Sequence, residues 1–297
     1  MIKILKRKYE NMKIAIIVNL TKQRAIVCAA RICVIVKNAG AQVMMPPDCT
    51  DYFPDNGVTF AESLEQLFET ADMAVTVGGD GTIIHAAKYA ACTGTPLIGV
   101  NVGRLGFVSD VEPNEIGDLK KLISGNYYAE ERLLLEVEVR KPNGVKKFLA
   151  VNDAVLTHGT LSKIVDFTLS LNGEEISKYR ADGLLFSTPT GSTAYSLSAG
   201  GPIISPQMDC ILMTPVCPHS LFSRSVLFDV DSALGVTVKI PAGCGCVLSI
   251  DGETNINITE QDVVTVRKAE RRLTLISVKK RNFYRKLNNK LKERELR

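Results

Sequence analysis

The sequence has no cysteine pair of the kind that binds zinc or carries redox chemistry. Its eight cysteines stand at positions 28, 33, 49, 92, 210, 217, 244 and 246, without C-x-x-C spacing, and its three histidines are scattered. A structural zinc site or a thioredoxin-type motif requires such pairs. We interpret the cysteines as buried thiols of a reducing compartment, rather than as metal ligands or disulfides.

Long apolar runs are missing as well. No window approaches the roughly 20 apolar residues of a membrane-spanning helix, and residues 1–11 are charged and lack the apolar core of a signal peptide. Apolar residues nevertheless make up 45% of the chain, which is typical of an ordinary globular protein. We therefore expect a cytoplasmic protein with no membrane partner.

The chain also has little excess of one charge. It contains 36 lysines and arginines against 32 aspartates and glutamates, and part of the net charge of +4 lies in the end segments 3–8 and 279–297. A nucleic-acid-binding domain typically carries a concentrated basic surface. We expect no nucleic-acid partner.

The first 100 residues alternate apolar runs of strand length with stretches of helix length. The expected strands are 14–18, 42–45, 73–77 and 96–100, and the expected helices are 22–39, 60–69 and 83–91. Such alternation produces parallel strands joined by crossover helices. The pattern predicts an N-terminal α/β, Rossmann-like domain at residues 12–130 that binds nucleotide or phosphate.

From about residue 133 the pattern changes to short β-rich runs separated by turn residues such as Asn172-Gly173. The expected strands are 133–140, 147–156, 167–171, 184–187, 225–228, 236–240, 247–250 and 262–268. This half predicts a C-terminal antiparallel β-sandwich domain at residues 131–272. Residues 273–297 are expected to form a strand and a charged, solvated closing helix, with a return to the first domain as one option.

A glycine-rich turn, Gly78-Gly79-Asp80-Gly81-Thr82, follows a buried strand and opens a helix. Glycines at this place allow the backbone N–H groups to approach an oligophosphate closely. Asp80 would repel phosphate unless it holds a metal ion or takes a proton from an attacking hydroxyl. The alternative is a tight turn in which Asp80 only caps the helix.

Two familiar phosphate-binding motifs are absent. The sequence has no G-x-x-x-x-G-K-[ST], and Gly99, Gly103 and Gly106 do not have the spacing of G-x-G-x-x-G. Their absence argues against a Walker-type ATPase and against an ordinary dehydrogenase.

A second motif covers residues 182–202, which are rich in hydroxyls and glycines and almost free of charge. Hydroxyls around the aromatic Tyr195 suit the recognition of a ribose and a heterocyclic ring. The alternative is a serine-rich turn of the sandwich.

Together these motifs resemble the NAD kinase family. The turn at 78–82 is shared with diacylglycerol and sphingosine kinases and, more distantly, with phosphofructokinases. Segment 182–202 is similar to the motif of NAD kinases, and lipid kinases do not carry it in this form. The resemblance extends over most of the chain, through segments 12–19, 101–107, 151–154 and 214–219.

The resemblance implies a role for each motif. Asp80 would be the general base for the ribose 2′-hydroxyl of NAD. Phosphate and nucleotide binding would fall to Gly78, Gly79, Gly81 and Thr82. NAD binding would fall to Asn152, Asp153, Lys163, Arg180, Asp182, Thr190, Thr193, Ala194, Tyr195, Ser196, Leu197, Ser198 and Glu253. The chain departs from the family at Asp153, where glutamate is frequent, and at Glu253, where glutamine is frequent.

The implied reaction is ATP plus NAD giving ADP plus NADP. Mg²⁺ or another divalent cation would accompany ATP, without a dedicated metal site on the protein, and polyphosphate stays open as a second donor. Both motifs would have to converge on NAD at the domain boundary. The resemblance also implies a homodimer or homotetramer in which a neighbouring subunit completes the NAD pocket. The alternatives are a lipid kinase and a non-catalytic NAD-binding sensor.

Overall fold

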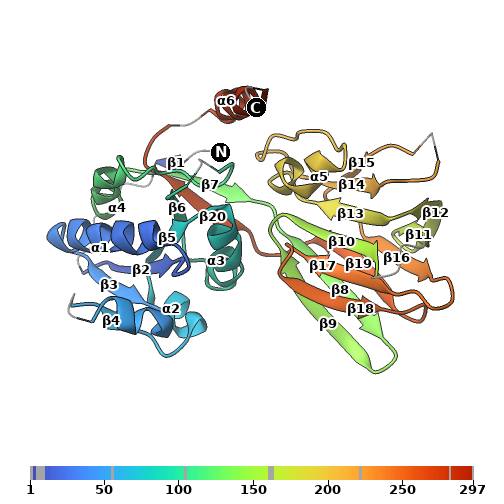
Figure 1. Ribbon diagram of the computed structural model, residues 1–297, viewed down its shortest axis with the longest axis horizontal. Helices are drawn as coiled ribbons and strands as arrows, with labels where there is room; N and C mark the ends of the chain where they lie inside the picture. Colours follow the sequence, from blue (N-terminus) through green and yellow to red (C-terminus); the bar gives the residue numbers. More distant parts are fainter. Residues whose placement is uncertain are drawn as a thin grey trace. The chain divides into compact units, whose positions relative to one another are not determined.

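The computed structural model describes residues 3–4, 11–54, 57–103, 106–159, 164–220, 223–280 and 282–295. The chain divides into two compact units (Figure 1). The first unit combines Met1–Glu131 with Leu273–Arg297, and the second is Arg132–Arg272.

The first unit is built on an eight-stranded sheet in the order β1-β7-β20-β6-β5-β2-β3-β4. The strands from β20 to β4 in this order are parallel, and β1 pairs antiparallel with β7. The strands are β1 Lys3–Ile4, β2 Lys13–Val18, β3 Gln42–Met45, β4 Thr59–Phe60, β5 Met73–Gly78, β6 Leu97–Asn101, β7 Tyr128–Arg132 and β20 Leu273–Ser277.

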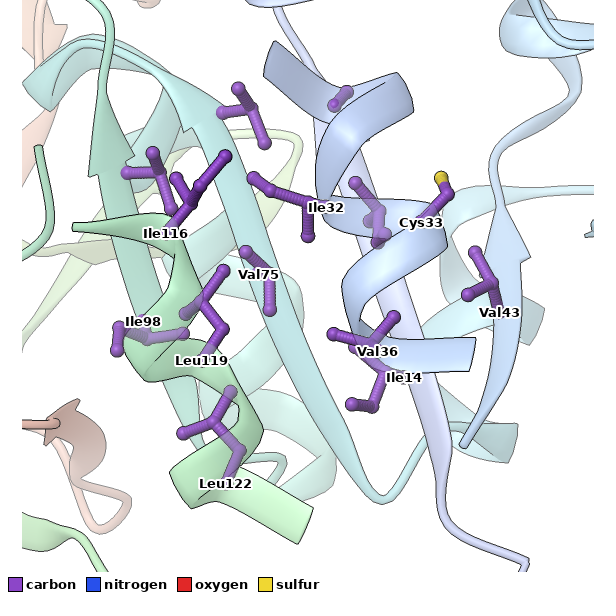
Figure 2. Packing of buried hydrophobic residues seen from close by; sticks show 14 of the residues in the cluster. Ile14, Ile32, Cys33, Val36, Val43, Val75, Ile98, Ile116, Leu119 and Leu122 are labelled. Carbon is purple, nitrogen blue, oxygen red and sulfur yellow. The ribbon is translucent and has the colours of Figure 1, made fainter. Parts of the chain in front are cut away.

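Helices cover both faces of this sheet. The helices of the first unit are α1 Gln23–Asn38, η1 Pro47–Tyr52, α2 Leu64–Thr70, α3 Asp80–Thr93, η2 Ile116–Leu119, α4 Lys120–Ile123 and α6 Phe283–Glu295. Figure 2 shows Ile32 of α1 and Leu119 of η2 in the same apolar cluster as Val75 of β5. Ile98 of β6 belongs to this cluster, so the next residue, Gly99, points to the other face of the sheet. A Cβ at Gly99 would lie 2.2 Å from Cδ1 of Ile83, which places helix α3 on that opposite face.

Two expectations for the first unit need correction at the ends of elements. The stretch 60–69 is not one helix, since β4 ends at Phe60 and α2 begins after Ser63, whose Oγ accepts a hydrogen bond from the N–H of Gln66 at 3.2 Å. Helix α3 begins at Asp80, three residues before the expected start at Ile83. Asp80 therefore lies in the first turn of the helix.

The second unit contains two six-stranded antiparallel sheets in the orders β15-β14-β13-β10-β17-β18 and β12-β11-β16-β19-β8-β9. Its elements are β8 Leu135–Lys141, β9 Gly144–Ala150, β10 Asp153–His158, β11 Val165–Leu171, β12 Glu174–Ala181, β13 Gly183–Ser187, η3 Gly191–Thr193, α5 Tyr195–Ser198, β14 Cys210–Val216, β15 Val226–Asp229, β16 Leu234–Lys239, β17 Cys246–Ile250, β18 Thr254–Ile258 and β19 Val263–Lys268. One apolar core takes side chains from both sheets, among them Phe186 and Phe167. The expected pairing of an α/β domain with an antiparallel β-sandwich is confirmed.

The expected strand 147–156 is two strands that belong to different sheets. Strand β9 ends at Ala150 and β10 begins at Asp153, so that Val151 and Asn152 carry the chain from one sheet to the other. A continuous run of apolar residues cannot distinguish one long strand from two strands joined by such a crossing.

No helix among the described residues is both long enough and apolar enough to cross a lipid bilayer.

Candidate functional site

The glycine turn joins the buried strand β5 to helix α3 in the first unit. A Cβ at Gly78 would lie 2.2 Å from Oγ1 of Thr82, so only glycine fits at this position. The N–H of Thr82 donates to the carbonyl of Gly79 at 3.0 Å, which closes the first turn of α3. The sequence thus folds into a tight turn with a helix N-terminus at the end of the strand.

The carboxylate of Asp80 is held by backbone N–H groups of the loop that follows β6. Its Oδ2 accepts hydrogen bonds from the N–H of Phe107 at 2.6 Å and of Val108 at 3.4 Å, and its Oδ1 accepts one from the N–H of Ser109 at 3.0 Å. These donors hold the carboxylate in one orientation. Since each carboxylate oxygen can accept two hydrogen bonds, Oδ1 has the capacity for a further donor.

The approach of this loop to Asp80 depends on Gly106. A Cβ at that position would lie 1.7 Å from Oδ1 of Asp80, closer than any Cβ can approach. The N–H of Gly106 donates to Oγ of Ser109 at 2.9 Å, which closes the loop on itself. We name residues 106–109 the amide loop.

A pocket of about 550 Å³ lies beside the turn within the first unit. Its walls include Asn19 and Thr21 after β2, Pro47 of η1, and Gly81, Thr82 and His85 of α3. Its volume is in the usual range for sites that bind small molecules. The N-terminus of α3 forms one wall, and such a terminus favours anions.

In the second unit a different aspartate binds a set of consecutive backbone N–H groups. Asp251 lies in the hairpin between β17 and β18, and its carboxylate accepts hydrogen bonds from the N–H groups of Val151 at 3.0 Å, Asn152 at 2.7 Å and Asp153 at 3.1 Å. The φ angles of Asp251 and Gly252 are 51° and 71°, as a type I′ turn requires. The hairpin therefore fixes the backbone of the predicted Asn152-Asp153 pair.

The side chain of Asp153 is buried, with 5% of its surface exposed. Burial, together with the smaller effect of the Asp251 charge, raises the pKa of its carboxyl to about 7. Asp153 can therefore exist in either protonation state near neutral pH.

The hydroxyl-rich segment packs directly against this pair. The N–H of Thr188 donates to the carbonyl of Asn152 at 2.9 Å, and its Oγ1 donates to the carbonyl of Val151 at 2.7 Å. A Cβ at Gly191 would lie 2.1 Å from the carbonyl oxygen of Asn152, so glycine permits the contact. The structure thus brings the start of the predicted NAD-binding segment beside Asn152 and Asp153.

Some hydroxyls of this segment have internal partners. Oγ1 of Thr193 donates to the carbonyl of Thr190 at 3.3 Å, and Oγ of the buried Ser196 forms a 3.1 Å hydrogen bond with Oγ1 of Thr214. Tyr195 is 45% exposed. Among the other predicted residues, Ser198 is exposed, whereas Ala194 and Leu197 are half-buried.

The remaining predicted NAD-binding residues lie outside segment 188–198. Arg180 is exposed at the end of β12, with its Nε 3.8 Å from Oδ1 of Asp166, and Asp182 precedes β13. The segment 188–198 follows the other end of β13, a strand of 5 residues that spans roughly 16 Å. Glu253 is exposed in the β17–β18 hairpin. Lys163 lies outside the described residues.

Sequence reasoning gave no role to the amide loop or to the carboxylate of Asp251. Segment 101–107 is marked in the sequence only by its resemblance to the family, and the pair Asp251-Gly252 is explained by an ordinary type I′ hairpin as well as by substrate binding. A signal was present in both cases, namely a glycine or aspartate in a short loop that follows a buried strand.

Five of the eight cysteines are buried as expected, namely 28, 33, 49, 210 and 246. The expectation is wrong for the other three, since Cys92 and Cys217 are exposed and Cys244 is half-buried. In the described part of the chain, no group of three or more histidine, cysteine, aspartate or glutamate side chains lies close enough to hold a metal ion. Burial raises the pKa of Cys33 to about 11 and those of Cys49 and Cys246 to about 12, which disfavours the nucleophilic thiolate.

Two family models match the chain. The ATP-NAD kinase N-terminal domain matches residues 14–127, and the ATP-NAD kinase C-terminal domain matches residues 151–278. The first match contains the glycine turn and the amide loop. The second contains the Asn152-Asp153 pair, the hydroxyl-rich segment and Asp251.

Individual relatives give the same result. The chain is 38% identical to an NAD kinase of Carboxydothermus hydrogenoformans over 239 residues, which is 80% of this chain and 85% of the relative. It is 33% identical to an NAD kinase of Acetivibrio thermocellus over 285 residues, 95% of this chain and 98% of the relative. Among solved structures, yeast NADH kinase complexed with NADH matches with a TM-score of 0.86 at 25% identity, covering 96% of this chain and 88% of that one.

Proposed function

The chain belongs to the NAD kinase family, and on that premise we propose that it transfers the γ-phosphoryl group of ATP to the 2′-hydroxyl of the adenosine ribose of NAD. The products are NADP and ADP. The observation that carries this proposal is the carboxylate of Asp80, which is oriented by backbone N–H groups at the start of a helix whose first turn lines a pocket.

Asp80 acts as the general base. The 2′-hydroxyl donates a hydrogen bond to the carboxylate and passes its proton there as the oxygen attacks the γ-phosphorus. One oxygen–phosphorus bond forms, the bond between the γ-phosphorus and the bridging oxygen breaks, and ADP leaves with the electron pair. The second hydrogen-bonding capacity of Oδ1 supports this role.

The phosphates of ATP bind at the glycine turn. Gly78, Gly79, Gly81 and Thr82 present a helix N-terminus on which negative charge is stabilised. A divalent cation bound to ATP, such as Mg²⁺, would neutralise phosphate charge. Polyphosphate is a second donor to be tested.

NAD is recognised by the second unit. Asn152 and Asp153 bind the nucleotide from a backbone that Asp251 holds in place, and the exposed ring of Tyr195 stacks on a base. Thr190, Thr193, Ala194, Leu197 and Ser198 line the same surface, whereas Ser196 shapes the turn through Thr214. Glu253 contacts the dinucleotide from the neighbouring hairpin.

Arg180 and Asp182 lie at the other end of β13. We therefore assign them to the NAD pocket of a neighbouring copy in a homodimer or homotetramer. We place the enzyme in the cytoplasm. Sedimentation of the purified chain checks the assembly, with a monomer as the contradicting result.

The lipid-kinase alternative finds no support in the comparisons, because both matching family models are those of NAD kinases. Incubation with radiolabelled ATP and either NAD or diacylglycerol tests the proposal. We expect labelled NADP and no labelled lipid. Binding of NAD without turnover would instead indicate the sensor, and label in the lipid would indicate the lipid kinase.

A further inference from the structure

The C-terminal helix α6 is anchored to the first unit rather than being a solvated tail. It begins with an N-cap, because Oδ1 of Asn282 accepts hydrogen bonds from the N–H groups of Tyr284 at 2.9 Å and Arg285 at 3.2 Å. Leu287 is buried, with 9% of its surface exposed. The helix therefore has a defined start and a buried apolar contact.

One lysine of this helix binds the amide loop. Nζ of Lys286 donates hydrogen bonds to the carbonyl oxygens of Phe107 at 2.9 Å and Ser109 at 2.6 Å. Nζ of Lys290, one turn further along, lies 4.6 Å from the centre of the Phe107 ring. Lys286 and Lys290 thus contact the same short segment.

The two sides of the amide loop have different partners. Phe107 and Ser109 donate their N–H groups to the carboxylate of Asp80, and they accept hydrogen bonds from Lys286 at their carbonyl oxygens. The peptide group between residues 107 and 108 has the ammonium group at its oxygen and donates its N–H to Asp80. Hydrogen bonds that continue through one peptide group strengthen each other.

We propose that Lys286 is a positioning residue for the reaction. Its ammonium group holds the amide loop, so that the N–H groups of the loop orient the carboxylate of Asp80. This inference rests on the proposed function of Asp80. Hydrogen bonds to a charged donor are the stronger ones, and Lys286 is half-buried, where they are screened less by water. Without the ammonium group the loop loses two hydrogen bonds on the side that faces away from Asp80.

Replacement of the lysine tests this role. Lys286→Met keeps an unbranched apolar stem up to the ε position and removes the ammonium group. We expect kcat to fall about tenfold while KM for ATP and for NAD changes less than twofold. Lys286→Arg should recover most of the loss, because it keeps a charged donor. The matched control is Lys292→Met, an exposed lysine of the same helix, which should retain the kcat of the unsubstituted enzyme.

A double-mutant cycle distinguishes positioning from general stabilisation. If Lys286 acts through Asp80, Lys286→Met should reduce kcat little further in an Asp80→Asn background. A full tenfold loss in that background would overturn the inference.

Hydrogen exchange gives a readout that needs no activity. The amides of Phe107 and Ser109 should exchange about tenfold faster in Lys286→Met than in the unsubstituted protein, and at the unsubstituted rate in Lys292→Met. If the unsubstituted chain makes no NADP, the proposed function fails. If it makes NADP but Lys286→Met changes neither kcat nor exchange, the positioning role fails alone.

Discussion

Each unit of the molecule holds one aspartate by consecutive backbone N–H groups, but the two arrangements serve different purposes. Asp80 is bound by the N–H groups of 107–109, and Asp251 by those of 151–153. Under the proposed function, the amides of the first unit orient a carboxylate that accepts a proton. In the second unit the carboxylate orients a backbone that is proposed to bind NAD.

The two backbone segments that bind these carboxylates also differ in how they are held in place. The amide loop has little secondary structure of its own, and Lys286 holds it from the side away from Asp80. The segment 151–153 joins two strands and needs no such cation, since β9 and β10 fix both of its ends. We infer that changes in the first unit should act mainly on kcat, and changes in the second mainly on KM for NAD.

The largest effect is expected from Gly106→Ala. The added Cβ would collide with Oδ1 of Asp80, so that the amide loop must move away from the carboxylate. We expect kcat to fall about a hundredfold or more, in line with the loss of a general base. Gly117→Ala is the control, because nothing lies within 4 Å of a Cβ there. Equal kcat values for the two variants would show that the close approach is unimportant.

Asp153→Asn is expected to change how strongly the free energy of unfolding depends on pH. Burial raises the pKa of Asp153 from 3.8 to about 7, so between these values the folded chain binds more protons than the unfolded chain and its stability falls as the pH rises. From pH 5 to pH 7 the unsubstituted protein should lose about 2 kcal/mol more than the variant does. Urea unfolding at both pH values measures this difference, and equal pH slopes would contradict the assignment.

Asp251→Asn tests the contrast between the units directly. Asparagine tolerates a positive φ but has no charge, so the three hydrogen bonds to 151–153 weaken. We expect KM for NAD to rise about tenfold with little change in kcat. Asp229→Asn is a suitable control, since that exposed carboxylate also accepts a backbone hydrogen bond, from Asp231. A fall in kcat with constant KM would break the comparison.

The smallest effect is expected at Tyr195. Its ring is 45% exposed, and its proposed role is stacking on a base of NAD. Tyr195→Ala should raise KM for NAD about fivefold through the loss of that contact, whereas Tyr195→Phe should stay within twofold because the ring remains. Steady-state kinetics at saturating ATP provide the measurement. If Phe weakens binding as much as Ala, the hydroxyl rather than the ring makes the contact.

The sequence predicts the local parts of this account well. Periodicity and turn residues place the strands and the helix around Asp80, because these features depend on neighbours a few residues away. The crossing at Val151 and Asn152 was missed, since apolar residues on both sides of it form an unbroken pattern.

The partners of the functional side chains could not be predicted in this way. The amides that bind Asp80 lie 27 to 29 positions away, those that bind Asp251 lie about 100 positions away, and Lys286 lies 177 positions beyond Ser109. Such contacts depend on how distant segments meet in the fold, which no local pattern encodes. For the same reason, the charged composition of α6 left a return to the first domain as one option and could not indicate its contact with the amide loop.

The most direct test of the account is the rate of NADP formation by the unsubstituted enzyme and by Asp80→Asn. Asparagine keeps the shape of the side chain but cannot accept the proton of the 2′-hydroxyl. We expect kcat to fall about a hundredfold or more while the affinity for NAD, measured by calorimetry, stays within threefold. Equal kcat values for the two proteins would remove Asp80 from the reaction.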